Sequence, residues 1–170
     1  MFRPLLISVL ILACFALFET AILSNLLFLP GTPDFLLMCV LYFSARNGKV
    51  FGVATGFASG LMLDFLTASP LGFHCLLRTA VGYLAGAFNR SINMAGALVP
   101  FAFGLFATLA KKILVVLISL TFSSVGSGPP VLSAEFLCEL AANAVLTPVV
   151  FRFLGVFGEK LVLERTADVP

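Results

Sequence analysis

The sequence predicts an all-α, polytopic membrane protein that forms a single transmembrane domain over residues 1–170. Of these residues, 61% are hydrophobic and only 11% are charged, whereas soluble domains carry about 25% charged residues. The mean hydropathy of +1.14 arises from apolar runs along the whole chain, so one membrane anchor does not account for it. The net charge of +2 is small and dispersed. This charge argues against a nucleic-acid partner and leaves lipid and other membrane proteins as the expected partners.

Six apolar runs, separated by Pro, Gly or charged residues, fit transmembrane helices. A helix needs about 20 apolar residues to cross the hydrocarbon core of a bilayer. The predicted helices cover residues 5–28, 33–45, 50–66, 71–88, 97–122 and 133–158. The breaks between them are turn-forming. The break at residues 30–33 puts Pro33 at the first helical position of the second run.

The second run is the shortest, and it leaves two interpretations of the topology. Its 13 or so residues, at about 1.5 Å each, reach only about 20 Å, so the run either spans a thinned bilayer or is re-entrant. Six spans with both termini in the cytoplasm are favoured, because positive charge then collects at the cytoplasmic ends. The bases at those ends are Arg3, Arg46, Lys49, Arg90, Arg152, Lys160 and Arg165.

Glycines recur every four residues in the third run and again in the fourth. The six glycines are Gly48, Gly52, Gly56, Gly60, Gly82 and Gly86. On a helix this spacing makes a bare ridge, which allows a second backbone to approach closely in lipid. We interpret the ridge as a helix-packing surface. Packing inside the chain is the first interpretation, and a dimer or partner interface is the second.

Ionisable residues inside the predicted spans fall at one depth, in the outer third of the membrane. They are Glu19, Asp64, Arg78, Lys111, Lys112, Glu135 and Glu139. Four acids and three bases at similar depth are expected to neutralise one another, because an unpaired charge in hydrocarbon costs several kcal/mol. This outer polar layer is either a structural set of ion pairs or a pocket or docking surface open to the outside.

Two residues interrupt the apolar pattern of the last predicted helix. Pro148 removes one backbone hydrogen bond, so the carbonyl of Ala144 loses its usual donor and the helix is expected to bend. Asn143 lies near the same turn and is expected to bond to a neighbouring helix. Together these two residues form a candidate kink or partner face.

The sequence offers no set of residues for catalysis, for a metal or for a cofactor. His74 is the sole histidine, and there is no HExxH or GxxxxGK motif. The four cysteines are isolated in apolar runs, where small buried side chains are the ordinary interpretation. Cys14 loosely resembles a lipoprotein cleavage site, but an uncleaved first span fits it better. We therefore expect no enzyme activity.

Several short motifs, in order along about half of the chain, resemble the MreD family. The matching segments are Pro33-Asp34, Leu41-Tyr42-Phe43, Gly56-Phe57, Gly60-Leu61, the stretch "DFLTASPLG" from Asp64 to Gly72, Gly82-Tyr83-Leu84, and Asn143 to Pro148. Their order and spacing carry the resemblance, since no single element is decisive. Arg78 and the Lys111-Lys112 pair are not part of it.

The resemblance implies a non-enzymatic scaffold in the bacterial cytoplasmic membrane. It implies that MreC is a direct partner, and that RodA, a penicillin-binding transpeptidase and MreB belong to the same peptidoglycan-synthesising complex. It also implies a fold similar to the substrate-binding S-components of ECF vitamin transporters. A transporter subunit of that kind is the alternative function, because it would share the fold and use the polar layer to bind a small molecule.

Overall fold

The chain folds into a bundle of helices, seen here in a computed structural model that describes residues 2–21, 31–67, 70–89, 96–121 and 133–161. Within those ranges there is no strand. The helices are α1 (Phe2–Ala21), α2 (Phe35–Asn47), α3 (Lys49–Leu66), α4 (Phe73–Ala87), α5 (Leu98–Thr121), α6 (Ala134–Val156) and the short α7 (Gly158–Leu161). They follow the six predicted runs closely, although residues 22–28 of the first run lie outside the described residues.

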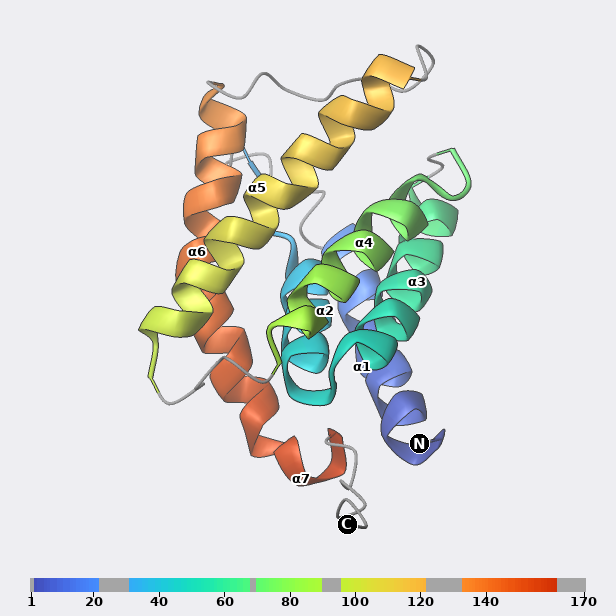
Figure 1. Ribbon diagram of the computed structural model, residues 1–170, viewed down its shortest axis with the longest axis vertical. Coiled ribbons are helices and arrows are strands. Elements are labelled where there is room, and N and C mark those ends of the chain that lie inside the picture. Colours follow the sequence, from blue (N-terminus) through green and yellow to red (C-terminus); the bar gives the residue numbers. More distant parts are fainter. Residues whose placement is uncertain (1, 22–30, 68–69, 90–95, 122–132, 162–170) are drawn as a thin grey trace.

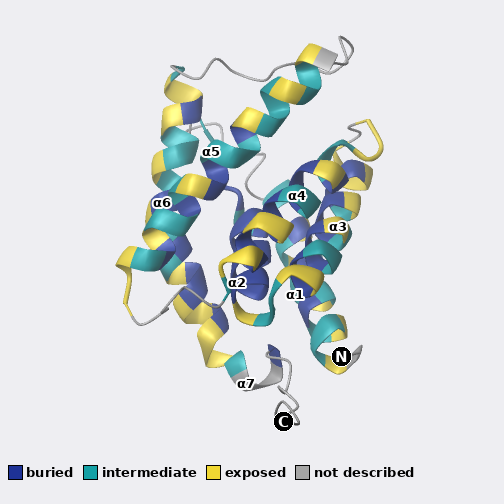
Figure 2. Cartoon of the chain, viewed as in Figure 1, coloured by how far each residue is buried: buried dark blue, intermediate teal, exposed yellow. Residues whose placement is uncertain are grey.

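Helix α2 is the centre of the bundle, and α1, α3, α4, α5 and α6 all pack against it (Figure 1). Every residue from Leu36 to Ala45 is buried, and the burial colouring shows this helix as the darkest part of the chain (Figure 2). This position accounts for its 13 residues. A helix enclosed by protein does not have to match the bilayer thickness, because its ends meet other helices and not lipid.

Both ends of α2 are fixed by particular residues. Asp34 is the N-cap, and its carboxylate accepts a hydrogen bond from the backbone N–H of Leu37 at 2.8 Å. The expectation that Pro33 opens the helix was therefore wrong, because the carboxylate cap delays the start to Phe35. At the other end Gly48 has φ +89°, a conformation that favours glycine. Gly48 thus makes the turn into α3 and lies outside the helix. Its backbone still packs against α4, because a Cβ atom added to Gly86 would lie 2.6 Å from the carbonyl carbon of Gly48.

Glycines line the contact between α3 and α4, the two helices joined by residues 67–72. A Cβ atom added to Gly52 would lie 2.3 Å from the carbonyl oxygen of Gly82, and one added to Gly60 would lie 2.5 Å from the Cα of Cys75. Gly56 faces the backbone of Arg78 in the same way. The two backbones therefore touch directly, and the structure places this ridge inside the chain. We call this contact the glycine seam.

Helices α5 and α6 form a second antiparallel pair beside α2 (Figure 1). Gly104 allows their close approach, since a Cβ atom there would lie 2.9 Å from the carbonyl oxygen of Asn143. Pro148 lies inside α6, and this helix changes direction partway along its length (Figure 1). The bend carries the end of α6 beneath the centre of the bundle.

The start of α1, the α2–α3 turn and the end of α6 lie at one end of the bundle (Figure 1). Arg3, Arg46, Lys49 and Arg152 are at or near these helix ends. Arg90 and Arg165 lie outside the described residues. Four described helices, α1, α3, α5 and α6, are long and apolar enough to cross a membrane, whereas α2 and α4 are shorter. The chain is accordingly a helical membrane protein.

Candidate functional site

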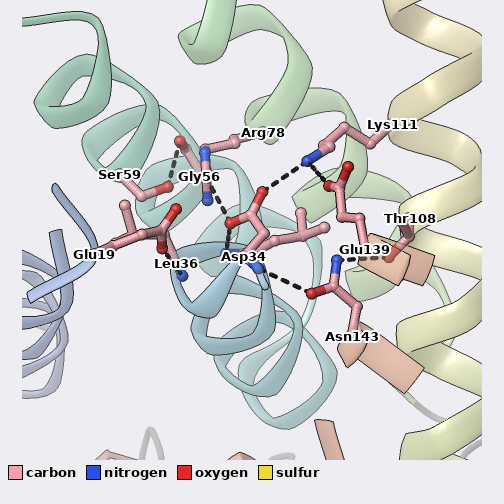
Figure 3. A network of polar contacts seen from close by, with 11 residues as sticks. Glu19, Asp34, Leu36, Gly56, Ser59, Arg78, Thr108, Lys111, Glu139 and Asn143 are labelled. Atoms are coloured by element: carbon pink, nitrogen blue, oxygen red, sulfur yellow. Dashed lines mark hydrogen bonds and ion pairs between the residues drawn. The ribbon is translucent and has the colours of Figure 1, made fainter. Parts of the chain in front are cut away.

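Asp34 is the centre of a polar network at the buried N-terminus of α2 (Figure 3). The Nη2 atom of Arg78, from α4, lies 2.7 Å from one carboxylate oxygen, and Nζ of Lys111, from α5, lies 3.0 Å from the other. The side chains of Asp34 and Arg78 are 8% and 2% exposed. One carboxylate therefore links two bases from two helices while it caps a third.

Glu139 of α6 extends this network and balances its charge. Its carboxylate accepts a short hydrogen bond from the Lys111 ammonium group. The chain of contacts runs from Arg78 through Asp34 and Lys111 to Glu139, so two acids compensate two bases. This balance is what makes burial tolerable, because removing one partner of a buried ion pair typically costs about 3–5 kcal/mol.

Asn143 connects the same centre to α5 and α6 through neutral hydrogen bonds. Its Oδ1 accepts from the backbone N–H of Asp34 at 2.9 Å, and its Nδ2 donates to Oγ1 of Thr108 at 3.0 Å. Asn143 is 1% exposed and Thr108 fully buried, so both find protein partners where water is excluded. The hydroxyl of Thr108 in turn donates to the carbonyl of Gly104.

Glu19 joins α1 to the same end of α2. Its carboxylate accepts a hydrogen bond from the backbone N–H of Leu36 at 3.1 Å, one of the N–H groups that a helix start leaves without an intrahelical partner. Four helices, α1, α4, α5 and α6, thus meet around the first turn of α2, each through a polar side chain.

The other predicted members of the outer polar layer do not share these contacts. Asp64 accepts hydrogen bonds from the backbone N–H groups of Gly72 and His74 at 2.8 and 2.9 Å, so it caps α4 and makes no ion pair in the described chain. Glu135 is exposed. Lys112 is buried, with its ammonium group 5.7 Å from the ring centroid of Phe136. Lys112 nevertheless lines the same cavity as Lys111 and Glu139. Asp64 and Glu135 are not among the residues that line this cavity, so similar depth along the helices did not bring these two acids into the network.

Sequence reasoning missed two residues of this site: Asp34, on which the ion pairs depend, and Thr108, which accepts a hydrogen bond from Asn143. Asp34 was read only as part of a motif, although an aspartate just before an apolar run is a recognisable N-cap signal. Thr108 gave no signal, because a threonine in an apolar helix ordinarily bonds to its own backbone.

A cavity of about 330 Å³ adjoins the network. Charged side chains from the network line it together with apolar groups such as Phe73 and Leu77. Within the described ranges, no three His, Cys, Asp or Glu side chains are grouped to hold a metal ion. The arrangement can hold helices in register and can bind a small polar group. It brings together no nucleophile and base of the kind that covalent catalysis uses.

Comparison with known proteins gives one family. A family model described as "rod shape-determining protein MreD" matches residues 3–157, which is most of the chain. No curated protein and no solved structure matches this chain.

Proposed function

Because the chain belongs to the MreD family of rod shape-determining proteins, we propose that it is a non-enzymatic membrane scaffold of the bacterial cell-wall elongation complex. Membership of the family gives it a role in cell shape. The proposal adds that it binds MreC directly, that RodA, a penicillin-binding transpeptidase and MreB belong to the same complex, and that the complex directs peptidoglycan synthesis.

The charge-balanced network around Asp34 is the observation that best supports a scaffold. Arg78, Lys111 and Glu139 are engaged with Asp34 or with one another, so their charges hold α2, α4, α5 and α6 together. A protein that positions partners benefits from such rigidity. An enzyme would instead need some of these groups to be available to a substrate.

We propose that the chain is one transmembrane domain with six spans in the bacterial cytoplasmic membrane. Arg3, Arg46, Lys49 and Arg152 lie toward one end of the bundle, which supports placing that end in the cytoplasm. Under this proposal α2 and α4 count as spans although they are short, because the neighbouring helices complete the crossing.

The ECF S-component remains the second candidate function, because the cavity of about 330 Å³ combines a mostly apolar lining with several charged side chains, as small-molecule sites do. The two functions differ in their partners. A transporter subunit should associate with an energy-coupling ATPase module, whereas a shape-determining scaffold should associate with MreC.

Affinity purification of the full chain from its native membranes distinguishes them. We expect MreC to co-purify in near-stoichiometric amount and to remain after the detergent is exchanged. Recovery of an ATPase module without MreC would reject the scaffold and favour the transporter subunit. A tagged, unrelated membrane protein expressed to the same level is the control for nonspecific recovery.

A further inference from the structure

A second cavity, of about 490 Å³, lies at the other end of α2, between that helix, the start of α5 and the end of α6. Arg46 and Arg152 line it, and no acidic side chain is among its described lining residues. Neither arginine forms an ion pair within the described parts of the chain. This cavity therefore differs from the one beside Asp34, where acids and bases balance.

Arg46 lies over an aromatic ring, and its guanidinium group forms no ion pair with the described residues. Its guanidinium carbon lies 5.9 Å from the centroid of the Tyr42 ring, and that ring packs edge-on against Phe151. A guanidinium over an aromatic face keeps its N–H donors in its own plane, where they can bind phosphate oxygens in pairs.

Two further features of the wall favour an anion. Gly96 and Ala97 precede the first turn of α5, a 24-residue helix, and the start of a helix carries free N–H groups and partial positive charge. The Tyr42 side chain also lines the cavity, and its buried hydroxyl has no hydrogen-bond partner among the described residues. Two arginines, a helix start and the Tyr42 side chain thus line one space.

The apolar part of the wall favours a lipid as the source of that anion. Pro100, Val149 and Phe151 line the cavity beside the arginines. Its two arginines are near the ends of α2 and α6. These helix ends lie at the same end of the bundle as the start of α1 (Figure 1). Basic pockets between transmembrane helices near this level are suited to anionic lipid headgroups.

We propose that this cavity binds the phosphate of an anionic phospholipid, with Arg46 and Arg152 on the phosphate oxygens and the apolar wall against the glycerol and the first part of the acyl chains. The site is independent of the network around Asp34 and of the partner proposed above.

The test is lipid retention by the full chain. The protein is reconstituted in nanodiscs of phosphatidylglycerol and phosphatidylcholine in equal amounts, and the retained lipids are counted by native mass spectrometry. We expect phosphatidylglycerol to be retained over phosphatidylcholine. The double variant Arg46→Gln/Arg152→Gln should retain at most about one tenth as much phosphatidylglycerol as the original chain.

The matched control is Arg3→Gln/Lys49→Gln, which removes two charges from the same end of the bundle without changing the cavity lining, and it should retain phosphatidylglycerol within about twofold of the original chain. Equal retention of the two lipids by the unmodified chain would overturn the proposal, whatever the folding of the variants. An equal loss in the control pair would also overturn it, and so would displacement of the lipid by inorganic phosphate, which would indicate a site for the free ion.

Discussion

The glycine seam and the network around Asp34 hold the same bundle together by different physical means. At the seam, Gly52 and Gly82 bring two backbones into contact, and no charged side chain is needed between them. In the network, Arg78, Asp34 and Lys111 come from three separate parts of the chain and bind through charge. The stability of the glycine seam therefore depends on the small volume of its side chains, and the stability of the network depends on the balance of its charges.

This difference follows from the solvent. Between helices in lipid there is little hydrophobic driving force, so small residues stabilise by allowing van der Waals contact. A charge in the same environment is costly until a partner cancels it. A larger side chain should therefore disrupt the seam, whereas a neutral side chain of unchanged size should disrupt the network.

The largest effect is expected from Asp34→Asn, which keeps the size of the side chain and removes its charge. Arg78 would then lose its ion-pair partner in the described part of the chain, and Lys111 would keep only Glu139. We therefore expect a loss of about 3 kcal/mol or more in the free energy of unfolding. This free energy is measured by unfolding the purified chain in detergent. Glu135→Gln is the control, because Glu135 is exposed and should change little. An equal, small effect of both substitutions would remove the distinction between network and seam.

A somewhat smaller loss is expected from Gly52→Leu at the seam. Its Cβ atom would lie 2.3 Å from the carbonyl oxygen of Gly82, so α3 and α4 must separate, at a cost of about 2–3 kcal/mol. The measurement is the amount of folded protein in membranes together with its unfolding midpoint. Gly155→Leu is the control, since a Cβ atom there meets nothing within 4 Å. Normal folding of the Gly52 variant would mean that the helices adjust and that volume does not limit this contact.

A modest loss is expected from Asn143→Ala, which removes neutral hydrogen bonds and leaves every charge paired. Hydrogen bonds between transmembrane helices average about 0.6 kcal/mol, so we expect about 1 kcal/mol in unfolding and a protein that still inserts. Thr108→Val removes one of the two bonds of the Asn143 side chain together with the Thr108 bond to the Gly104 carbonyl, and should cost a similar amount. A loss as large as that of Asp34→Asn would show that the amide matters as much as the charges.

The smallest effect on stability is expected from Pro148→Ala, which restores a backbone hydrogen bond in α6 and should straighten the helix. The unfolding midpoint should stay the same or rise slightly. Under the proposed function, recovery of MreC per inserted molecule should nevertheless fall, because the bend shapes the end of α6. An unchanged MreC ratio would make Pro148 a feature of local helix geometry only.

The helices were predictable because each is a continuous apolar run, and the glycines because their spacing repeats within one run. The polar contacts around Asp34 were not predictable, because the residues that make them lie at positions 19, 34, 78, 108, 111, 139 and 143, and only the fold brings them together. Depth along each helix predicted one polar layer. The fold brings Arg78, Lys111 and Glu139 of that layer to Asp34 or to one another, whereas Asp64 and Glu135 make no ion pair among the described residues, since depth says nothing about which face of a helix a side chain occupies.

The most direct test of charge balance as the basis of the network is a double-mutant cycle between Asp34 and Arg78. Asp34→Asn and Arg78→Gln should each destabilise strongly, whereas the double variant leaves Lys111 and Glu139 paired and should recover much of the loss. We expect a coupling free energy of about 2–3 kcal/mol in unfolding. Additive losses, with a coupling near zero, would contradict the account.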